Sequence, residues 1–158
     1  MRGDGNGWTW CALGHRHWGR YGAAGLLLRR DDPARSVISG VCAAPSVLLQ
    51  HRAAWTSDGG TWALPGGARD SHESVVQAAL REAHEEAGID QAAVEVVGEW
   101  QDDHGGWSYT TVIAVVVGPL RLEPNAESAE LRWVAESDVA DFALHPGFAD
   151  SWPSLRRG

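Results

Sequence analysis

Three glutamates share one side of a predicted helix. Glu82, Glu85 and Glu86 are spaced i, i+3 and i+4, and this spacing places their carboxylates on one helical face within about one turn. Like charges placed in this way repel one another, and a cation between them reverses the sign of that interaction. Mg²⁺ takes oxygen ligands from carboxylates, waters and substrate phosphates. The face therefore predicts a site for Mg²⁺ or Mn²⁺, and the alternative is an ordinary solvated acidic helix.

The residues around the glutamates favour the metal site over the solvated face. Gly66 and Gly67 come shortly before the helix, and their lack of side chains lets a loop approach the carboxylates closely. Arg81 precedes Glu82 directly and follows Glu73 by eight residues. The guanidinium group is a fork of donors that suits carboxylates. We expect Arg81 and Glu73 to hold a ligand glutamate in position, as metal sites generally require.

Together these residues form a pattern that resembles a known family. The pattern is Gly67-x5-Glu73-x7-Arg81-Glu82-Ala83-x-Glu85-Glu86-x-Gly88-Ile89, and it resembles the Nudix box with each fixed glycine, glutamate and arginine in register. Ala83 departs from the family, which usually has a larger aliphatic residue there, and this should affect helix packing more than chemistry. The segment 62–67 resembles the strand and turn that precede the box in many members. The resemblance covers residues 21–134.

The resemblance implies a fold and an activity. The fold is the Nudix α/β/α sandwich, with a mixed sheet between helices, as one domain over residues 18–158. The activity is hydrolysis of a nucleoside diphosphate linked to another group, with a metal-activated water attacking phosphorus. The implied metal ligands are Glu82, Glu85, Glu86 and the backbone of Gly67, and the general base is Glu82 or a loop glutamate. Dimers are common in the family, so a homodimer is an expectation.

Members of the family often use one further glutamate from outside the box. In MutT-like enzymes it lies in the loop before the strand that resembles residues 130–134 here. Glu127 is the first candidate for this role and Glu130 is the second. The alternative is that both are exposed residues of an acidic loop.

Aromatic residues in two segments are candidates for contact with the nucleoside. Trp107 and Tyr109 share one face of a strand that begins at a glycine-rich loop, where a base could stack on them. Trp18 and Tyr21 precede the first strand of the domain, which lines the nucleoside pocket in MutT-like enzymes. The polar candidates for contact with base edges are Asp102, Asp103 and His104. The alternatives are packed sheet aromatics and an exposed polar loop tip.

The resemblance favours one substrate class by absence of markers for others. ADP-ribose hydrolases commonly carry a proline shortly after the box. Here the first proline after the box is Pro119, which lies well beyond that region. Dinucleoside polyphosphate hydrolases tend to have a tyrosine in this region, which Tyr109 matches only loosely. We therefore expect a MutT-like (deoxy)nucleoside triphosphate pyrophosphohydrolase that releases a monophosphate and pyrophosphate, with oxidised purine nucleotides as candidate substrates. The alternatives are the two other hydrolases and a non-catalytic nucleotide-binding module, which often lacks box glutamates or carries a DNA-binding segment.

The elements that position these residues can be predicted from local patterns. Residues 71–87 should form a helix, with Asp70 as N-cap, Glu73 as its capping-box partner and Gly88 at the C-terminal end. Residues 1–17 contain four glycines without periodicity and predict a poorly ordered arm. Residues 29–45 predict a long connection. The predicted strands are 21–28, 46–51, 61–64, 94–100, 108–117 and 130–134, the first two paired as a hairpin, and further helical segments are 136–142 and 146–155.

Composition limits the partners. The 158 residues include 13 Lys and Arg against 21 Asp and Glu, a formal net charge of −8, so bulk electrostatics exclude binding of duplex nucleic acid. An anionic small substrate is still compatible with this negative charge, because a bound metal ion can neutralise the charge of the substrate. The longest apolar run, Val112 to Val117, is far too short to cross a membrane.

The cysteines indicate a compartment but no site. Cys11 and Cys42 lack the spacing of a CxxC motif, and two cysteines are too few for a disulfide framework or a zinc site. The N-terminus has no secretory signal pattern. We therefore expect a protein of the reducing cytoplasm.

Overall fold

The computed structural model describes residues 3–30, 45–56 and 58–156 of the chain. In these residues seven strands form one mixed sheet with the order β5-β4-β3-β8-β7, to which β6 adds at β3 and β9 at β4. β3 and β8 are parallel, and the other pairs are antiparallel. The strands are β3 (Ala23–Arg30), β4 (Ser46–Arg52), β5 (Trp62–Ala63), β6 (Gly66–Ala68), β7 (Val94–Asp103), β8 (Ser108–Val116) and β9 (Ser128–Ala135).

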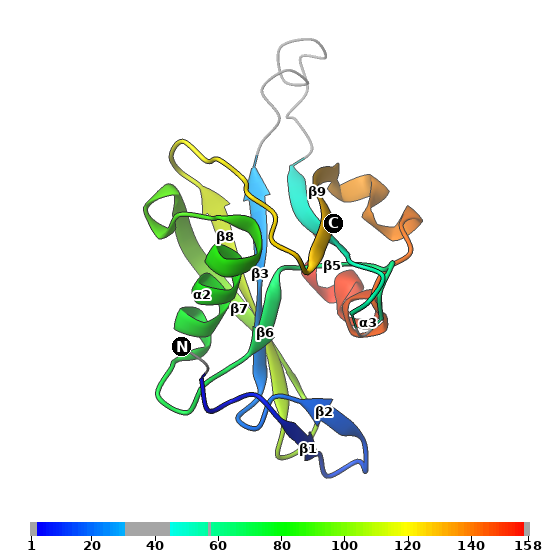
Figure 1. Ribbon diagram of the computed structural model, residues 1–158. Coiled ribbons are helices and arrows are strands. Elements are labelled where there is room, and N and C mark those ends of the chain that lie inside the picture. The colour runs from blue at the N-terminus through cyan, green and yellow to red at the C-terminus, as the bar shows by residue number, and fades with distance from the viewer. Residues whose placement is uncertain (1–2, 31–44, 57, 157–158) are drawn as a thin grey trace.

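The central strand β3 divides the core into two layers. Successive side chains of a strand point to opposite faces, and Leu26 and Leu28 pack against the alanines of α2 (Val75–Ala87) while Leu27 packs on the side of α3 (Pro146–Leu155). Figure 1 shows α2 and α3 on opposite sides of the sheet. The predicted α/β/α sandwich with a mixed sheet is confirmed. Ala83 is fully buried on the core-facing side of α2, which is consistent with an effect on packing.

Helix α2 begins four residues later than predicted. Its N-cap is Ser74, whose hydroxyl accepts from the Gln77 amide while the Gln77 side chain accepts from the Ser74 amide. The predicted capping box of Asp70 and Glu73 is therefore wrong, because the Asp70 amide donates to Glu73 in a separate turn before the helix. The predicted end is confirmed, since Gly88 has a left-handed φ of 70°.

The predicted poorly ordered arm contains a β-hairpin. β1 (Trp8–Trp10) and β2 (Arg16–Trp18) pair antiparallel, and the Trp8 and Trp18 rings meet edge to face at 5.2 Å. The prediction for residues 1–17 is wrong for this part, because strands of three residues are too short to show a period in the sequence. The hairpin lies beside the loop between β7 and β8 at the bottom of Figure 1, and the Ala12 amide donates to the Gly105 carbonyl at 2.7 Å.

Several other boundaries differ by a few residues. β6 was not predicted, since its sequence of two glycines and an alanine resembles a turn, and β7 extends to Asp103. The predicted pairing of the first two sheet strands is present as β3 and β4. The helical segment 136–142 is a 3-10 helix, η2 (Glu136–Asp141), and a further one, η1 (Gln91–Ala93), precedes β7. Most of the predicted connection 29–45 lies outside the described residues.

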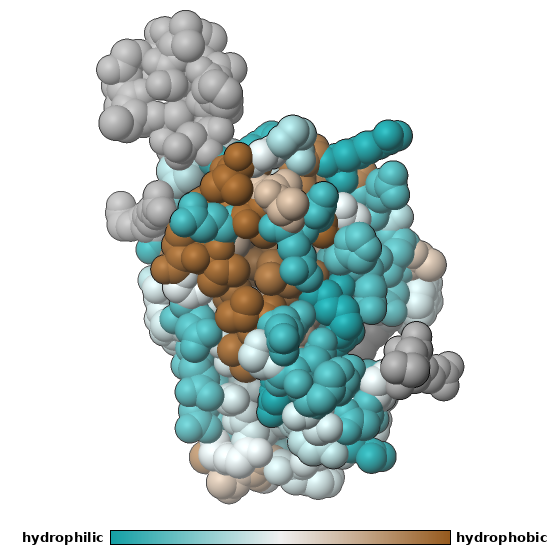
Figure 2. Space-filling view, turned by 90° about the vertical axis from the view of Figure 1, so that its left-hand side faces the viewer, coloured by the Kyte–Doolittle hydropathy of each residue, from teal (hydrophilic) through white to brown (hydrophobic). Residues whose placement is uncertain are grey.

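The surface offers one apolar area on the side that carries α2 in Figure 1. Figure 2 shows it surrounded by hydrophilic residues. Exposed apolar side chains on the edge strand β7 and after β8 are Val96, Val97 and Val117. Surfaces of this kind often mediate association, and the homodimer stays a prediction. Within residues 3–30, 45–56 and 58–156, none of the helices has the length and hydropathy of a membrane-spanning helix.

Candidate metal-dependent active site

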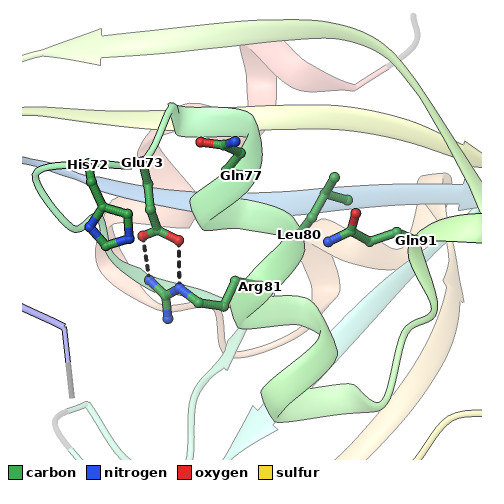
Figure 3. A pocket seen from close by; sticks show the side chains of 6 residues that line it. All are labelled: His72, Glu73, Gln77, Leu80, Arg81 and Gln91. Carbon is green, nitrogen blue, oxygen red and sulfur yellow. Dashed lines mark hydrogen bonds and ion pairs between the residues drawn. The ribbon is translucent and has the colours of Figure 1, made fainter. Parts of the chain in front are cut away.

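Arg81 on α2 connects the loop before the helix to the glutamates on it. Its Nε and Nη2 atoms donate to the two carboxylate oxygens of Glu73 at 2.7 and 2.8 Å, and Figure 3 shows this paired contact. Its Nη1 atom donates to Glu82 at 2.9 Å. These are the contacts that the sequence predicted. Hydrogen bonds from Arg81 hold the pKa of Glu73 below its usual range, and the Glu73 contact raises the pKa of Arg81, so both groups stay charged.

Glu82 and Glu86 face the sheet as two neighbouring carboxylates, of which Glu86 is buried and Glu82 is partly buried, with 15% of its side chain exposed. Glu86 is 4% exposed and accepts a hydrogen bond from the Gly66 amide at 3.1 Å. Burial raises the pKa of Glu86 well above its usual value, and the charge of Glu82 raises it further. Burial also raises the pKa of Glu82, against the opposing effect of Arg81. Two carboxylates are therefore kept close together where neither is well solvated.

The third glutamate is placed differently. The Glu85 side chain is 54% exposed and lies 3.5 Å from Nη1 of Arg81. It shares Arg81 with Glu82 but sits at the solvent side of the cluster. The i, i+3, i+4 spacing has thus brought the three carboxylates to one side of α2, with Glu82 and Glu86 deeper than Glu85.

Gly67 on β6 makes room for this arrangement. A Cβ atom at position 67 would lie 2.7 Å from the Glu82 carboxylate, which is closer than real Cβ contacts, so a side chain here would displace the Glu82 carboxylate from its position. β6 is held to β3 through the pairs Ala24 with Gly67 and Gly25 with Gly66. The donor set is made of carboxylate oxygens alone, partly buried and mutually repelling, and this fits a hard divalent cation.

The structure brings Glu127 towards the glutamates and leaves Glu130 elsewhere. The negative charge of Glu127 contributes to the raised pKa of Glu86. The chain around Glu127 is fastened to the Glu86 carbonyl, which accepts from the Asn125 amide at 3.1 Å and from the Ser128 hydroxyl at 3.3 Å. Glu130 instead forms an ion pair with Arg132 at 2.8 Å.

The two aromatic candidates of β8 lie in different surroundings. Tyr109 is half-buried and close to the glutamates, since burial and the charge of Glu86 both raise its pKa. Trp107 is buried in a separate cluster with Cys11 and Ala23. Its ring stacks on His17 at 4.0 Å, and its indole N–H donates to the Gly19 carbonyl at 2.8 Å. One face of Trp107 is thus covered by the protein itself.

The remaining substrate candidates are at the surface around the hairpin. Trp18 and Tyr21 are exposed, and Trp18 packs against Trp8. Asp102 and Asp103 belong to β7, while His104 follows it. The His104 ring is hydrogen-bonded to Asp102 at 3.0 Å and packs against His17 at 4.8 Å between ring centroids.

A hollow of about 410 Å³ borders the Glu73–Arg81 ion pair on the outer side of α2. Figure 3 shows its side chains, which come from the loop before α2, from α2 itself and from η1. The lining residues are His72, Glu73, Gln77, Leu80, Arg81 and Gln91. Glu82 and Glu86 do not line this hollow, so it adjoins the positioning residues and not the buried carboxylates.

Sequence reasoning missed the contacts that fix the loop before α2. The buried Asp70 carboxylate accepts from the Gly5 amide at 2.9 Å, and Asp4 accepts hydrogen bonds from Ser71. Asp70 also lies 3.8 Å from Arg81. No local pattern could reveal the contacts of Asp70 with Gly5 and of Ser71 with Asp4, because these partners are 65 and 67 positions apart in the sequence.

Comparisons with known proteins agree with this geometry. A family model described as NUDIX domain matches residues 30–157. A Mycobacterium tuberculosis protein named "Putative 8-oxo-dGTP diphosphatase 3" is 54% identical over 99% of this chain and 71% of its own length. A Bifidobacterium longum nucleoside triphosphate pyrophosphatase/Nudix hydrolase fusion protein is 45% identical over 94% of this chain and 30% of its own length.

Solved structures show the same fold. A Nudix hydrolase from M. smegmatis, RenU, has a TM-score of 0.86 and 53% identity, covering 96% of this chain and 93% of that one. A C. elegans Ap4A hydrolase complex has a TM-score of 0.65 and 20% identity, covering 85% of this chain and 94% of that one. At that identity the second likeness concerns the fold alone.

Proposed function

The chain belongs to the Nudix family and is a Nudix hydrolase, and we propose that it cleaves a (deoxy)nucleoside triphosphate to a monophosphate and pyrophosphate. The first candidate substrate is an oxidised purine nucleotide, 8-oxo-dGTP. The observation that supports hydrolysis is the buried Glu86 carboxylate next to the partly buried Glu82 carboxylate, beside the side-chain-free Gly67. The substrate proposal is supported by the name of the M. tuberculosis relative.

We assign Mg²⁺, with Mn²⁺ as a substitute, to the carboxylates on α2. Glu82, Glu85 and Glu86 would hold it together with the backbone of Gly67. A bound divalent cation neutralises the diphosphate and lowers the pKa of a bound water. This lets a chain with a formal charge of −8 accept a polyanion. Oxygen-only donors at this spacing fit the preference of Mg²⁺ for hard ligands.

The remaining roles belong to the chain's own residues. Arg81, fixed by its two bonds to Glu73 and by the Ala68 carbonyl at 3.0 Å, holds Glu82 in one orientation. The proton of the attacking water goes to Glu82 or to Glu127. Glu127 is exposed and reaches the cluster from the loop before β9, so it can turn with the substrate, whereas Glu82 is held by Arg81.

The candidate nucleoside contacts are less uniform than the metal ligands. Tyr109 lies near Glu86 and stays our candidate for contact with the bound nucleotide. Trp18 and Tyr21 are accessible at the surface before β3. Trp107 already stacks on His17, so a base could reach only its other face. The cytoplasmic location and the lack of affinity for duplex nucleic acid stay predictions.

A substrate panel tests this proposal. We would incubate the chain and Mg²⁺ with 8-oxo-dGTP, dGTP, ADP-ribose and a dinucleoside polyphosphate, and separate the products by ion-exchange chromatography. We expect the monophosphate and pyrophosphate in equal amounts, with the largest kcat/KM on 8-oxo-dGTP. Faster cleavage of ADP-ribose or the dinucleoside would overturn the substrate assignment. Tight binding of nucleotide without any product would instead identify a non-catalytic module.

A matched pair of variants ties turnover to the helix. Glu86→Gln removes a proposed ligand, and Glu95→Gln changes an exposed glutamate on β7. Only the first should lower kcat strongly, and equal activity of both variants would contradict the site.

A further inference from the structure

A second group of metal-binding side chains lies away from the glutamates. Cys11, His15, His17 and His104 each offer one ligand atom, and these four atoms lie within 4.8 Å of one another. Three of the four residues precede the segment 30–157 that the family model matches. The cysteine count alone predicted no zinc site, but a count of cysteines leaves out the histidines, which supply three of the four candidate ligands here.

The hairpin places three of these residues together. Cys11 follows β1, and its amide donates to the His15 carbonyl at 3.0 Å, closing the turn. His15 directly precedes β2 and His17 lies within it, and residues two positions apart in extended chain point to the same side. The turn therefore directs one thiol and two imidazoles to the same point.

The fourth residue comes from the loop between β7 and β8. The Ala12 amide donates to Gly105 at 2.7 Å, and the His104 amide donates to the Trp107 carbonyl at 2.8 Å. These backbone bonds fix His104 opposite the hairpin, 87 positions beyond His17 in the chain. The cluster thus joins two segments that are distant in sequence.

Two of the imidazoles are already oriented as metal ligands usually are. The Nε2 atom of His17 is buried and has no hydrogen-bond partner within the described part of the chain, and its ring is held flat against Trp107. A buried polar nitrogen without a partner is costly, and coordination removes that cost. Nε2 of His104 contacts Asp102 at 3.0 Å, which leaves Nδ1 for a metal in the carboxylate–histidine–metal arrangement.

We propose that Cys11, His15, His17 and His104 bind one Zn²⁺ ion that fastens the β1–β2 hairpin to the β7–β8 loop. One thiolate and three neutral imidazoles are ligands that zinc accepts in tetrahedral geometry, and Mg²⁺ does not favour them. On binding, the Cys11 thiol releases its proton to solvent and a sulfur–zinc bond forms. Four protein ligands leave no open position, so this site is structural and separate from hydrolysis.

Metal content and Co²⁺ spectroscopy test the proposal on the full chain. The purified protein is analysed for zinc by plasma mass spectrometry, stripped with a chelator, and titrated with Co²⁺ in excess Mg²⁺, which occupies the glutamate site. We expect about one zinc per chain, and with Co²⁺ a thiolate charge-transfer band together with intense tetrahedral d–d bands. A protein without zinc that gives only weak octahedral Co²⁺ bands would overturn the proposal.

Single substitutions then locate the ligands. Cys11→Ser should remove the charge-transfer band, and Cys42→Ser, at the chain's other cysteine, should keep it. His15 is exposed, so His15→Gln should fold even if Cys11→Ser does not, and we expect it to weaken zinc binding at least tenfold in a chelator competition. Unchanged zinc affinity in His15→Gln, or loss of the band in Cys42→Ser, would contradict the assignment. Glu86→Gln should retain zinc in full.

Discussion

The two proposed cation sites are built in opposite ways. The glutamate site takes three ligands from one turn of α2, where a spacing of three and four residues is sufficient to bring them together. The thiol–imidazole site takes its ligands from the three-residue strand β2, from the turn before it and from the β7–β8 loop, which is distant in the sequence. The first uses hard oxygen atoms and the second uses sulfur and nitrogen. Ligand chemistry thus separates a catalytic ion from a structural one within a small chain.

The difference also concerns what each site does to the protein. Glu82 and Glu86 repel one another in a poorly solvated place, so this cluster costs stability until a cation binds. The hairpin meets the domain at a small apolar cluster of Cys11, Ala23 and Trp107, and a metal that binds the folded state there would add stability. We therefore expect changes in the first cluster to affect turnover and changes in the second to affect unfolding.

The largest expected effect is on turnover at the helix. Glu86→Gln keeps the shape of the side chain and removes its charge, so it should lower kcat by on the order of 10²–10³-fold, as the loss of a group that stabilises transition-state charge does. Steady-state pyrophosphate release measures the effect. The zinc content of the same preparation is the control, and a variant within a few-fold of the parent in kcat would remove Glu86 from the site.

A smaller effect is expected from the group that positions Glu82. Arg81→Lys keeps a positive charge but cannot donate to both oxygens of Glu73 and to Glu82 at once. We expect kcat to fall by roughly 10–100-fold, as for residues that support metal ligands. A raised requirement for Mg²⁺ in the titration of activity distinguishes a positioning role from general instability, and an unchanged Mg²⁺ dependence would argue against it.

The hairpin site should show itself in unfolding. Removing the metal with a chelator, or by Cys11→Ser, should lower the thermal midpoint by roughly 5–10 °C. This is the shift expected when a protein loses a ligand whose free concentration is well above its Kd. Calorimetry with and without added Zn²⁺ measures it. Turnover measured well below the midpoint should persist. An identical midpoint in both forms would mean that no metal fastens the hairpin.

The smallest effect concerns where α2 begins. Ser74→Ala removes the N-cap hydroxyl that accepts from Gln77 and should cost about 1 kcal/mol in the free energy of unfolding, measured by urea denaturation. Because Ser74 is not near the reacting groups in the proposed site, kcat should stay the same. A cost close to zero would mean that Gln77 and the loop already fix the start of the helix without the hydroxyl.

The sequence predicts what depends on neighbours along the chain. The periodic spacing of Glu82, Glu85 and Glu86 and the left-handed Gly88 depend on one helix, and both are present. Leu26, Leu27 and Leu28 form a continuous apolar run, which is typical of a strand buried on both faces, and the structure places these leucines in both layers of the core. Asp70 was a misleading cap signal, because its carboxylate accepts from the distant Gly5 amide and not from the helix.

What depends on distant partners was not predictable. Two cysteines in the sequence do not indicate a zinc site, and only the fold brings His104 beside His17. The sequence suggested that Trp107 stacks on a base, because it is aromatic and follows a glycine-rich loop. In the structure the His17 ring of the hairpin covers one of its faces. Glu127 is an intermediate case, since the resemblance suggested a loop glutamate and the structure places its charge near Glu86.

Metal add-back to one stripped preparation tests the separation of the two sites most directly. The chain is freed of metal with a chelator and dialysed, and Mg²⁺ or Zn²⁺ is then restored singly while turnover of 8-oxo-dGTP and the thermal midpoint are both recorded. We predict that Mg²⁺ restores turnover and leaves the midpoint low, while one equivalent of Zn²⁺ restores the midpoint without turnover. If a single ion restored both properties, or Mg²⁺ restored no turnover, the account of two chemically distinct sites would be contradicted.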